Sequence, residues 1–319
     1  MAHVILHTED LSKRYGEVTA VSHLTLDVYA GEIFGFLGPN GAGKTTAINM
    51  ICGLLPPDSG HITIQGQRLH DNGASSAART WVGMCPQEIV IWERLTCLEQ
   101  LQFVGQMYNL SARAARQRAQ QLLQQLDLRE KQHKQARTLS GGMKRRLNIA
   151  LALVHDPQII VLDEPEAGLD PQSRVKVREF IQSLAHDKTI ILTTHNMDEA
   201  ERLADRIAII DHGQLLVLDT PTALKQQVGS GDVVEVALSA AMDEPAETAV
   251  TAQLGGLADQ VWLDATRQML SVRALHAVGH LAAILAAITQ VGLQPGEVRV
   301  RENSLEDVFI QLTGRRLRE

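Results

Sequence analysis

Short apolar runs alternate with longer amphipathic segments over roughly the first 220 residues of the chain. The runs "QIIVLDEP" (158–165) and "KTIILTTH" (188–195) are continuous and rich in β-branched residues, as expected of strands buried on both faces. Helical segments between such strands are typical of a parallel sheet that is flanked by helices. The pattern therefore predicts an α/β fold with a parallel sheet core.

The segment from about residue 88 to about residue 140 has a different composition, rich in Gln, Arg and Leu, and shows no strand pattern. Within "ARQRAQQLLQQLDLREK", the side chains of Leu122, Leu123 and Leu126 fall on one face of a helix. We predict a helical subdomain inserted into the α/β core, with its distal end returning to the core at Ser140.

A second change of pattern follows residue 228, where the Gly-Ser-Gly at 229–231 is the expected linker. The sequence thus predicts a larger first domain over 1–228 and a small domain over 232–319. In the second domain the strand and helix patterns follow the order βαββαβ, which is typical of a ferredoxin-like α+β sandwich. A last helix carries an apolar stripe that we expect to pack on its own chain, formed by Leu305, Val308, Phe309 and Leu312.

The mostly apolar stretch "ALHAVGHLAAILAAITQVGL" (274–293) is long enough to raise the question of a membrane span. His276, His280 and Gln290 interrupt it, and alanine supplies much of the remainder. We therefore expect an amphipathic helix packed in the second domain and no membrane-spanning segment.

The net charge and the cysteine content limit the binding partners and the compartment expected for this protein. The chain has 30 Lys and Arg against 37 Asp and Glu, and this net charge of −7 argues against a broad electrostatic contact with nucleic acid. Its three cysteines lack the CxxC spacing of zinc or redox sites, which favours a reducing compartment. The first residues lack the basic-then-apolar pattern of a signal peptide, so we expect a cytoplasmic protein.

A complete phosphate-binding motif follows the apolar run "EIFGFL". Such a glycine-rich turn between a strand and a helix presents backbone amides and the positive helix end to a phosphate. Lys44 is expected to meet the β- and γ-phosphates, and the Thr45 hydroxyl is expected to bind Mg²⁺. The nucleotide-binding residues predicted here are Gly38, Pro39, Asn40, Gly41, Ala42, Gly43, Lys44, Thr45 and Thr46.

The strand "IIVLDEP" ends in two adjacent carboxylates with different expected roles. Asp163 is placed to complete the Mg²⁺ shell, whereas Glu164 points elsewhere and can deprotonate a water molecule as a general base. An acidic pair at a strand end is common, but its combination with a phosphate-binding loop indicates nucleotide hydrolysis.

Three further residues follow or precede strand patterns near this predicted site. His195 ends the next strand, where an imidazole can bond a γ-phosphate or the attacking water. Gln87 lies where the helical subdomain begins, and its amide can reach Mg²⁺ or the water as a sensor of γ-phosphate. Tyr15 is either a half-buried core residue or a flat surface on which the purine stacks.

A second anion site is predicted in "LSGGMKRRLNIALAL" (139–153), where Ser140 can cap a helix and Gly141 and Gly142 expose amides at its positive end. A second cradle is surplus within one chain, because the first site already has a lysine, a metal shell and a base. It is useful if two copies pack head to tail, so that this turn caps the γ-phosphate bound by the other copy. The alternative is a capped helix with no ligand.

Taken together, these residues resemble the ATP-binding cassette (ABC) ATPases over about residues 4–220. "GPNGAGKTT" is similar to the Walker A motif, "LSGGM" to the ABC signature, "IIVLDEP" to Walker B and "GLD" (168–170) to the D-loop. Gln87, His195 and Tyr15 resemble the Q-loop, switch histidine and A-loop aromatic. Two residues depart from the usual pattern: Met143 replaces a frequent Gln, and Glu166 adds negative charge near the expected dimer seam, which puts normal hydrolysis rates in question.

The C-terminal extension ending in "SLEDVFIQLTGR" further resembles the daunorubicin-resistance type of exporter ATPase. This resemblance implies a subunit that binds and hydrolyses ATP with Mg²⁺ and pairs with separate integral membrane permeases of the ABC-2 type. Such subunits sit peripherally on the cytoplasmic face of the inner (plasma) membrane and commonly energise export of drugs, lipids or polysaccharides. The substrate would be selected by the permease.

The segment after Gln87 carries an apolar cluster, Ile89, Val90, Ile91 and Trp92, which is either core or a groove that receives a permease helix. A rival function is a soluble ABC ATPase acting on a non-membrane macromolecule such as the ribosome or DNA. Such a protein is expected to show two cassettes, a long coiled coil or a basic arm, and none is visible in the sequence. A second rival, a regulator without turnover, is disfavoured by Glu164.

Overall fold

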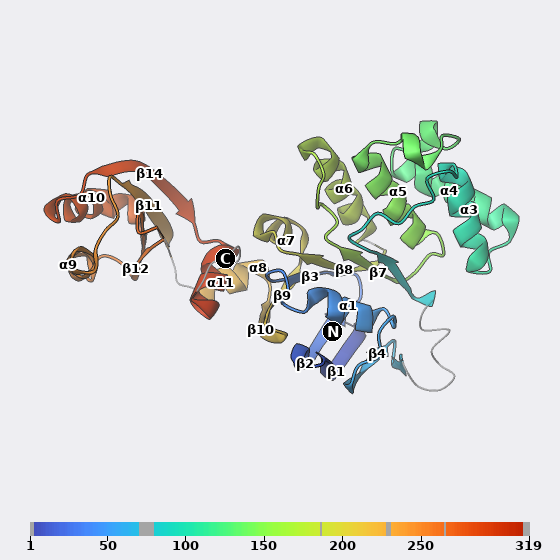
Figure 1. Ribbon diagram of the computed structural model, residues 1–319, viewed down its shortest axis with the longest axis horizontal. Coiled ribbons are helices and arrows are strands. Elements are labelled where there is room, and N and C mark those ends of the chain that lie inside the picture. Colours follow the sequence, from blue (N-terminus) through green and yellow to red (C-terminus); the bar gives the residue numbers. More distant parts are fainter. Residues whose placement is uncertain (1–2, 70–79, 186, 228–230, 265, 315–319) are drawn as a thin grey trace. The chain divides into compact units, whose positions relative to one another are not determined.

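The computed structural model describes residues 3–69, 80–185, 187–227, 231–264 and 266–314, and it forms two compact units (Figure 1). The first unit extends to Pro221, and the second begins at Thr222. The sequence placed this boundary after residue 228, whereas the helix α8 (Pro221–Gln227) already belongs almost entirely to the second unit. Two residues of the expected linker, Gly229 and Ser230, lie outside the described residues.

A six-stranded sheet forms the centre of the first unit, with five parallel strands and an antiparallel strand, β10, at one edge. Every residue of β7 and β8 is buried, as the continuous apolar runs predicted. In spatial order the strands are β10 (Gln214–Asp219), β9 (Arg206–Asp211), β3 (Ile33–Leu37), β8 (Thr189–Thr194), β7 (Ile159–Asp163) and β6 (Val82–Cys85).

Successive residues of the central strands enter two different hydrophobic clusters, one on each face of this sheet. Along β7, Ile160 and Leu162 join one cluster, and Ile159 and Val161 join the other. Helices contribute to both clusters, so the sheet is covered on both sides. The helices that follow its strands are α1 (Lys44–Ile51), α5 (Gly141–Leu153), α6 (Pro171–Leu184) and α7 (Met197–Leu203).

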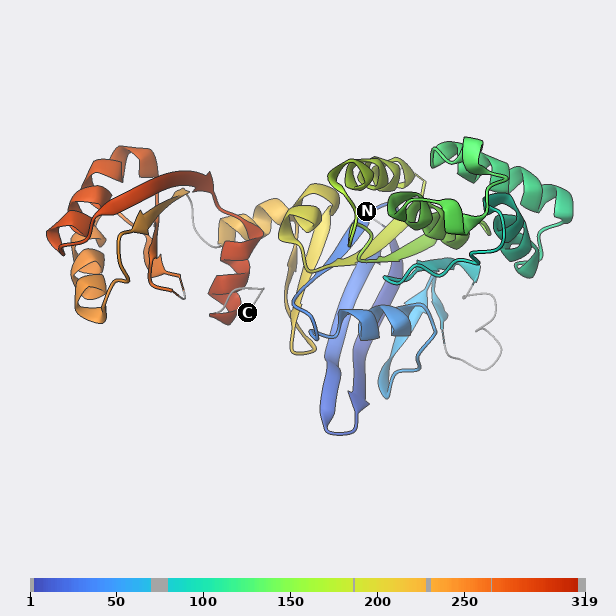
Figure 2. The same ribbon diagram turned by 45° about the horizontal axis from the view of Figure 1, so that its top comes forward.

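An antiparallel sheet, which the sequence pattern did not reveal, packs on the α1 side of the core. Figure 2 shows its long hairpin of β1 and β2. In β2, Leu24, Leu26 and Val28 are buried and alternate with more exposed residues, which is the period of a half-buried strand. Its strands in spatial order are β2 (Val18–Tyr29), β1 (Val4–Tyr15), β4 (Ser59–Ile64) and β5 (Gln67–Arg68).

The inserted segment after β6 contains α3 (Cys97–Met107) and α4 (Ala112–Gln125), which pack together beside α5 (Figures 1 and 2). A capping box formed by Thr96 and Glu99 starts α3. Leu122, Leu123 and Leu126 are buried in the larger cluster, as their helical spacing predicted. The segment is therefore helical and returns to the sheet through α5 and β7.

The second unit contains a four-stranded sheet in the order β12–β13–β11–β14, with all neighbours antiparallel. Two helices cover one face of the sheet and contribute Val250 and Ile284 to its core. This order and the sequence βαββαβ describe the ferredoxin-like sandwich that the pattern predicted. The elements are β11 (Asp232–Leu238), α9 (Glu244–Leu254), β12 (Gln260–Leu263), β13 (Met269–Ala274), α10 (Leu281–Gln290) and β14 (Pro295–Glu302).

The apolar stretch 274–293 divides into the end of β13, a 3₁₀ turn at Ala277–His280 and α10. Among the residues that the structure describes, no helix has both the length and the apolar character needed to cross a membrane. The final helix α11 (Leu305–Thr313) buries Leu305, Val308 and Phe309 within this chain, whereas Leu312 stays exposed. The expectation that α11 packs on its own chain is therefore correct for three of its four stripe residues.

Candidate functional site

The phosphate-binding loop joins β3 to α1, and two of its glycines are required by close backbone contacts. A Cβ atom on Gly43 would lie 2.1 Å from the carbonyl oxygen of Ala20, and φ at this residue is +100°. A Cβ atom on Gly38 would lie 2.2 Å from the carbonyl oxygen of Ile210. The loop therefore fits between β2 and β9 only with glycine at these two positions, and its backbone can approach a ligand closely.

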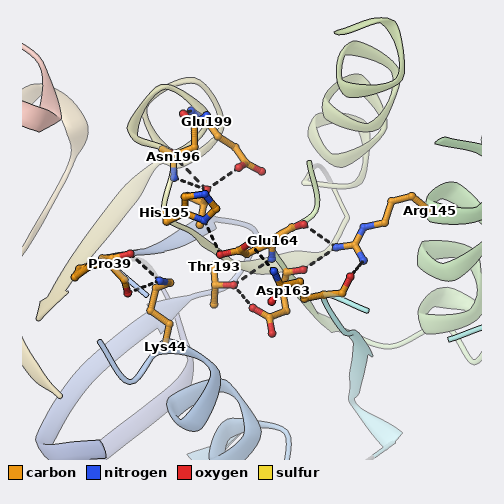
Figure 3. A network of polar contacts seen from close by, with 12 residues as sticks. Pro39, Lys44, Arg145, Asp163, Glu164, Thr193, His195, Asn196 and Glu199 are labelled. Carbon is orange, nitrogen blue, oxygen red and sulfur yellow. Dashed lines mark hydrogen bonds and ion pairs between the residues drawn. The ribbon is translucent and has the colours of Figure 1, made fainter. Parts of the chain in front are cut away.

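Lys44 is buried at the first position of α1, and its ammonium donates to the carbonyl oxygens of Gly38 (2.7 Å) and Pro39 (2.9 Å) (Figure 3). Burial lowers the pKa of Lys44, and the nearby carboxylates of Glu164 and Asp163 act in the opposite direction. The ammonium is therefore held between the loop and the acidic strand end, where phosphate oxygens can take over its hydrogen bonds.

Two predicted site residues from distant parts of the sequence meet at the carboxylate of Glu164. His195 Nδ1 lies 2.7 Å from Glu164 Oε1, and Gln87 Nε2 donates to Glu164 Oε2 at 2.9 Å. The backbone of Glu164 has φ +47°, and its amide donates to the carbonyl of Thr193 at 3.1 Å. The left-handed turn directs this carboxylate away from Asp163 and between the imidazole and the amide.

Asp163 ends β7, is buried, and accepts a hydrogen bond from the Thr193 hydroxyl. Thr45 is exposed at the start of α1, and Gln87 follows β6. In the described part of the chain, no group of three or more His, Cys, Asp or Glu side chains is arranged to hold a metal ion. The predicted donors are instead hydroxyl, amide and carboxylate oxygens, which is the chemistry that Mg²⁺ takes together with phosphate oxygens.

A cavity of about 350 Å³ opens beside the loop and adds residues that the sequence did not indicate. Val18, Thr19 and Ala20 come from an unpredicted antiparallel strand, and His212 comes from a turn without a recognisable motif. Tyr15 is not among the lining residues; it pairs with Val18 across the hairpin and is 52% exposed. The cavity is lined by Val18, Thr19, Ala20, Asn40, Gly41, Ala42, Gly43, Lys44, Thr45, Thr46, Gln87, Glu164 and His212.

Two further hollows, of about 320 and 470 Å³, lie along α4 and α6, away from these residues. Several of their charged side chains form ion pairs, including Arg118 with Asp156 at 2.8 Å and Lys176 with Asp127 at 2.7 Å. Lys188 also pairs with Asp156 at 2.9 Å. The loop cavity contains the amides, the buried lysine and the carboxylates together, so we place the functional site there.

The turn with the second predicted anion site starts α5, where the Ser140 hydroxyl accepts a hydrogen bond from the amide of Met143 at 3.3 Å. Gly142 cannot carry a side chain, because its Cβ would lie 2.2 Å from Ser173 Oγ. Ser140 and Gly141 are exposed, and neither lines the loop cavity. Within one chain, the structure therefore keeps the two predicted anion sites apart.

Glu166 does not present an unpaired charge, which corrects the concern raised by its position in the sequence. Its side chain is buried and accepts two hydrogen bonds from Arg178 of α6, at 2.9 Å from Nε and 2.7 Å from Nη2. Such a bidentate pair neutralises the carboxylate within the chain. The partner could not be identified from the sequence, because the pairing depends on how α6 packs.

Glu199 is a buried carboxyl that the sequence did not single out. Burial raises the pKa of Glu199 to about 7, the carboxylates of Glu166 and Glu164 act in the same direction, and the hydrogen bond from Thr194 opposes them. That hydrogen bond, from the Thr194 hydroxyl, is 2.6 Å long (Figure 3). Glu199 lies on α7, shortly after His195 in the chain. The negative charges of the neighbouring carboxylates favour the protonated form of its side chain.

The apolar segment after Gln87 is largely on the surface. Ile89, Val90 and Trp92 are exposed, whereas Ile91 packs against the larger core cluster. The Trp92 ring meets the exposed Phe103 ring of α3 edge to face, with centroids 5.6 Å apart. Of the two interpretations given by the sequence, core packing thus applies to Ile91 alone.

Comparison with known proteins agrees with this geometry. The family model described as "ABC transporter" matches residues 21–167. The linearmycin resistance ATP-binding protein LnrL of Bacillus subtilis is 37% identical over 318 residues, covering 99% of this chain and 100% of that protein. The daunorubicin resistance ATP-binding protein DrrA3 of Streptomyces coeruleorubidus is 36% identical over 323 residues, covering 100% and 99%.

A Nod factor export ATP-binding protein I, from Ralstonia nicotianae, is 41% identical over 317 residues, covering 99% of this chain and 95% of that protein. Among solved structures, the dimeric post-hydrolysis state of the ATP-binding cassette MJ0796 bound to ADP and Pi superposes with a TM-score of 0.61 at 26% identity. That match covers 67% of this chain and 98% of the other.

Proposed function

Because this chain belongs to the ATP-binding, ATP-hydrolysing subunits of ABC transporters, we propose that it energises export through separate ABC-2-type permease subunits. The observation that carries the proposal is the convergence of Gln87 and His195 on Glu164 beside the loop cavity. The names of its relatives refer to linearmycin resistance, daunorubicin resistance and Nod factor export. We extend the export role to this chain and assign it no particular substrate.

In the proposed reaction, the loop amides and Lys44 bind the phosphates of ATP, and Glu164 takes a proton from the attacking water. Gln87 and His195 hold both oxygens of the Glu164 carboxylate, so the orientation of the proposed base is fixed by two hydrogen bonds. Tyr15, next to the cavity-lining Val18, is proposed to stack on the purine. Mg²⁺, bound by Thr45, Asp163 and Gln87, would neutralise charge on the phosphates.

The exposed Ser140 and Gly141 are proposed to bind the γ-phosphate held by a second copy of the chain. Two observations support this proposal: the turn is exposed outside its own cavity, and the cassette MJ0796 has been solved as a dimer. A head-to-tail pair with two-fold symmetry brings each turn to the other chain's site. ATP would then hold the dimer together, and hydrolysis would release it.

The permease is proposed to contact the exposed apolar surface formed by Ile89, Val90, Trp92 and Phe103. Most of this surface directly follows Gln87, whose side chain bonds Glu164. A permease helix seated on it would therefore contact the segment that leads to Gln87. Contact with a permease would place the chain peripherally on the cytoplasmic face of the inner membrane. Nothing in the proposed reaction involves nucleic acid.

Co-expression with a multi-span membrane protein encoded beside this chain tests the proposal. We expect the chain to sediment with membranes only when that protein is present, and export to stop when Glu164 is replaced by Gln. A matched control is Glu244→Gln, which changes an exposed carboxylate in the second unit. A chain that hydrolyses ATP yet never binds membranes containing the neighbour would contradict the permease role and revive the soluble alternative.

A further inference from the structure

Arg145 is a buried cation one turn beyond the signature glycines, and only 1% of its surface is exposed. Its guanidinium donates hydrogen bonds to backbone carbonyls and reaches two separate loops of the site (Figure 3). The acceptors are the carbonyl oxygens of Pro86 (2.6 Å), Gln87 (3.1 Å), Asp163 (2.7 Å), Glu164 (2.9 Å) and Pro165 (3.1 Å).

Within the described part of the chain, the guanidinium of Arg145 makes no ion pair with a carboxylate. Burying a charge is costly unless hydrogen bonds and opposite charge compensate it. Here the compensation comes from carbonyl dipoles at the ends of β6 and β7, where the chain leaves the sheet. A planar group with five donors suits this arrangement, because it can bind two loops at once in fixed geometry.

The two loops are those that carry Gln87 and Glu164, whose side chains bond each other at 2.9 Å. Arg145 therefore joins α5, which starts with the signature turn, to the backbone of the general base and of the proposed γ-phosphate sensor. A displacement of α5 along its axis would therefore be transmitted to both loops by the Arg145 side chain.

The neighbouring Arg146 provides a comparison within the same helix. It is also buried, but its Nη1 donates to the carbonyl of Leu126 at 2.6 Å and lies 3.5 Å from the Asp127 carboxylate. These partners follow α4 in the helical subdomain and are remote from Glu164. Two adjacent buried arginines thus anchor α5 to different structures, and only Arg145 touches the site.

We propose that Arg145 is a positioning residue that couples the signature turn of a chain to the Gln87 and Glu164 loops of the same chain. When the turn engages the nucleotide of a partner copy, Arg145 sets the orientation of the carboxylate at its own site. Each of the two ATP sites in the dimer then depends on the other. This inference rests on the proposed ATP-sandwiched dimer.

The first test compares Arg145→Lys with Arg146→Lys, since an ammonium keeps the charge but cannot reach five carbonyls. For Arg145→Lys we expect kcat to fall roughly 10- to 100-fold, as for a base displaced by about 1 Å, with ATP affinity within about twofold of the original. The Hill coefficient of hydrolysis should fall from about 2 towards 1. Arg146→Lys should lower the melting temperature and keep the Hill coefficient. Equal losses of cooperativity in both variants would overturn the proposal.

Mixed dimers separate positioning from poor folding. In a dimer of one Glu164→Gln chain and one Arg145→Lys chain, the only working base lies in the chain that lacks Arg145, so hydrolysis should be lost. When both substitutions are in one chain and the partner is unmodified, the working base keeps its own Arg145 and hydrolysis should persist. The same activity in the two dimers would refute action within one chain. Arg145→Gln, which can still donate to two carbonyls, repeats the comparison if the lysine variant does not fold.

The outcome also distinguishes this inference from the proposed function. An unmodified chain that forms no ATP-dependent dimer, or hydrolyses ATP without cooperativity, would contradict the ATP-sandwiched dimer itself. Cooperative hydrolysis that is unchanged in both Arg145 variants would leave the dimer standing and remove Arg145 from the coupling.

Discussion

The imidazole Nδ1 of His195 lies 2.7 Å from Oε1 of Glu164, although the two residues directly follow different strands. An ionised carboxylate can only accept hydrogen bonds, so the Nδ1 atom carries the proton and Nε2 can accept a hydrogen bond from another group. The ring therefore orients the Glu164 carboxylate, the proposed base, at one of its oxygens, while Gln87 holds the other. Loss of either partner should affect hydrolysis through the same carboxylate.

Replacing Glu164 by Gln should reduce kcat by roughly 10²- to 10⁴-fold, or about 3–5 kcal/mol, because the general base is lost. ATP binding and ATP-dependent dimers should persist, since the loop and Lys44 are unchanged. Steady-state hydrolysis and size-exclusion chromatography with ATP measure both effects, with Glu244→Gln as the control. Unimpaired turnover in the Glu164 variant would remove this residue from the mechanism.

His195→Ala should also slow hydrolysis, and the double variant should be little slower than Glu164→Gln alone.

Lys44→Ala should weaken equilibrium binding of ATP by roughly 10- to 100-fold, because hydrogen bonds to charged groups contribute about 1.5–3 kcal/mol. The alanine also leaves the carbonyls of Gly38 and Pro39 without the donor seen here. Calorimetric titration with ATP measures the change. Arg113→Ala, an exposed cation in the first turn of α4, is the matched control. Equal affinities of the two variants would refute the assigned role of Lys44.

Trp92→Ala should weaken co-purification with a permease by roughly tenfold or more, as expected for an aromatic anchor at an interface. ATP affinity should not change, because Trp92 lies outside the loop cavity. Leu54→Ala, which removes an exposed apolar side chain elsewhere, should leave permease capture intact. Capture of the permease at the original level by the Trp92 variant would show that the contact lies on another surface.

The raised pKa of Glu199 predicts a dependence of stability on pH. Between its ordinary value of 4.5 and about 7, the folded chain holds a proton that the unfolded chain has lost. The contribution of Glu199 to the free energy of unfolding is therefore greatest below pH 4.5 and decreases as pH rises towards 7. Glutamine has no proton to lose, so Glu199→Gln avoids this loss. As pH rises from 5 to 8, the free energy of unfolding of this variant should increase by roughly 3 kcal/mol relative to that of the unmodified chain.

Urea unfolding of both proteins at pH 5, 6, 7 and 8 measures this difference. Glu201→Gln, two residues further along α7, provides a carboxylate control on the same helix. A difference between Glu199→Gln and the unmodified chain that stays constant across these pH values would show that Glu199 holds no proton in the folded state.

The core sheet and the helical insertion were predictable because continuous apolar runs and leucines at helical spacing reflect local burial. The N-terminal antiparallel sheet was not, because its alternation is broken. The pairing of β1 with β2 shifts register at several points, and Asp10 and His23 adopt positive φ. Such bulges insert residues and change which side chains face the core. The cavity residues on β2 were missed for the same reason.

The sequence by itself determined the phosphate loop, the acidic strand end, Gln87 and His195, because each follows a strand pattern and its chemistry depends on a few consecutive residues. Tertiary structure alone decided that Glu166 pairs with Arg178, that Glu199 is buried, and that Arg145 binds two site loops. The side chains and carbonyls in these contacts lie well apart in the sequence. The electrostatic interactions between these groups become strong only where packing excludes water. No local sequence pattern indicates which groups packing will bring together.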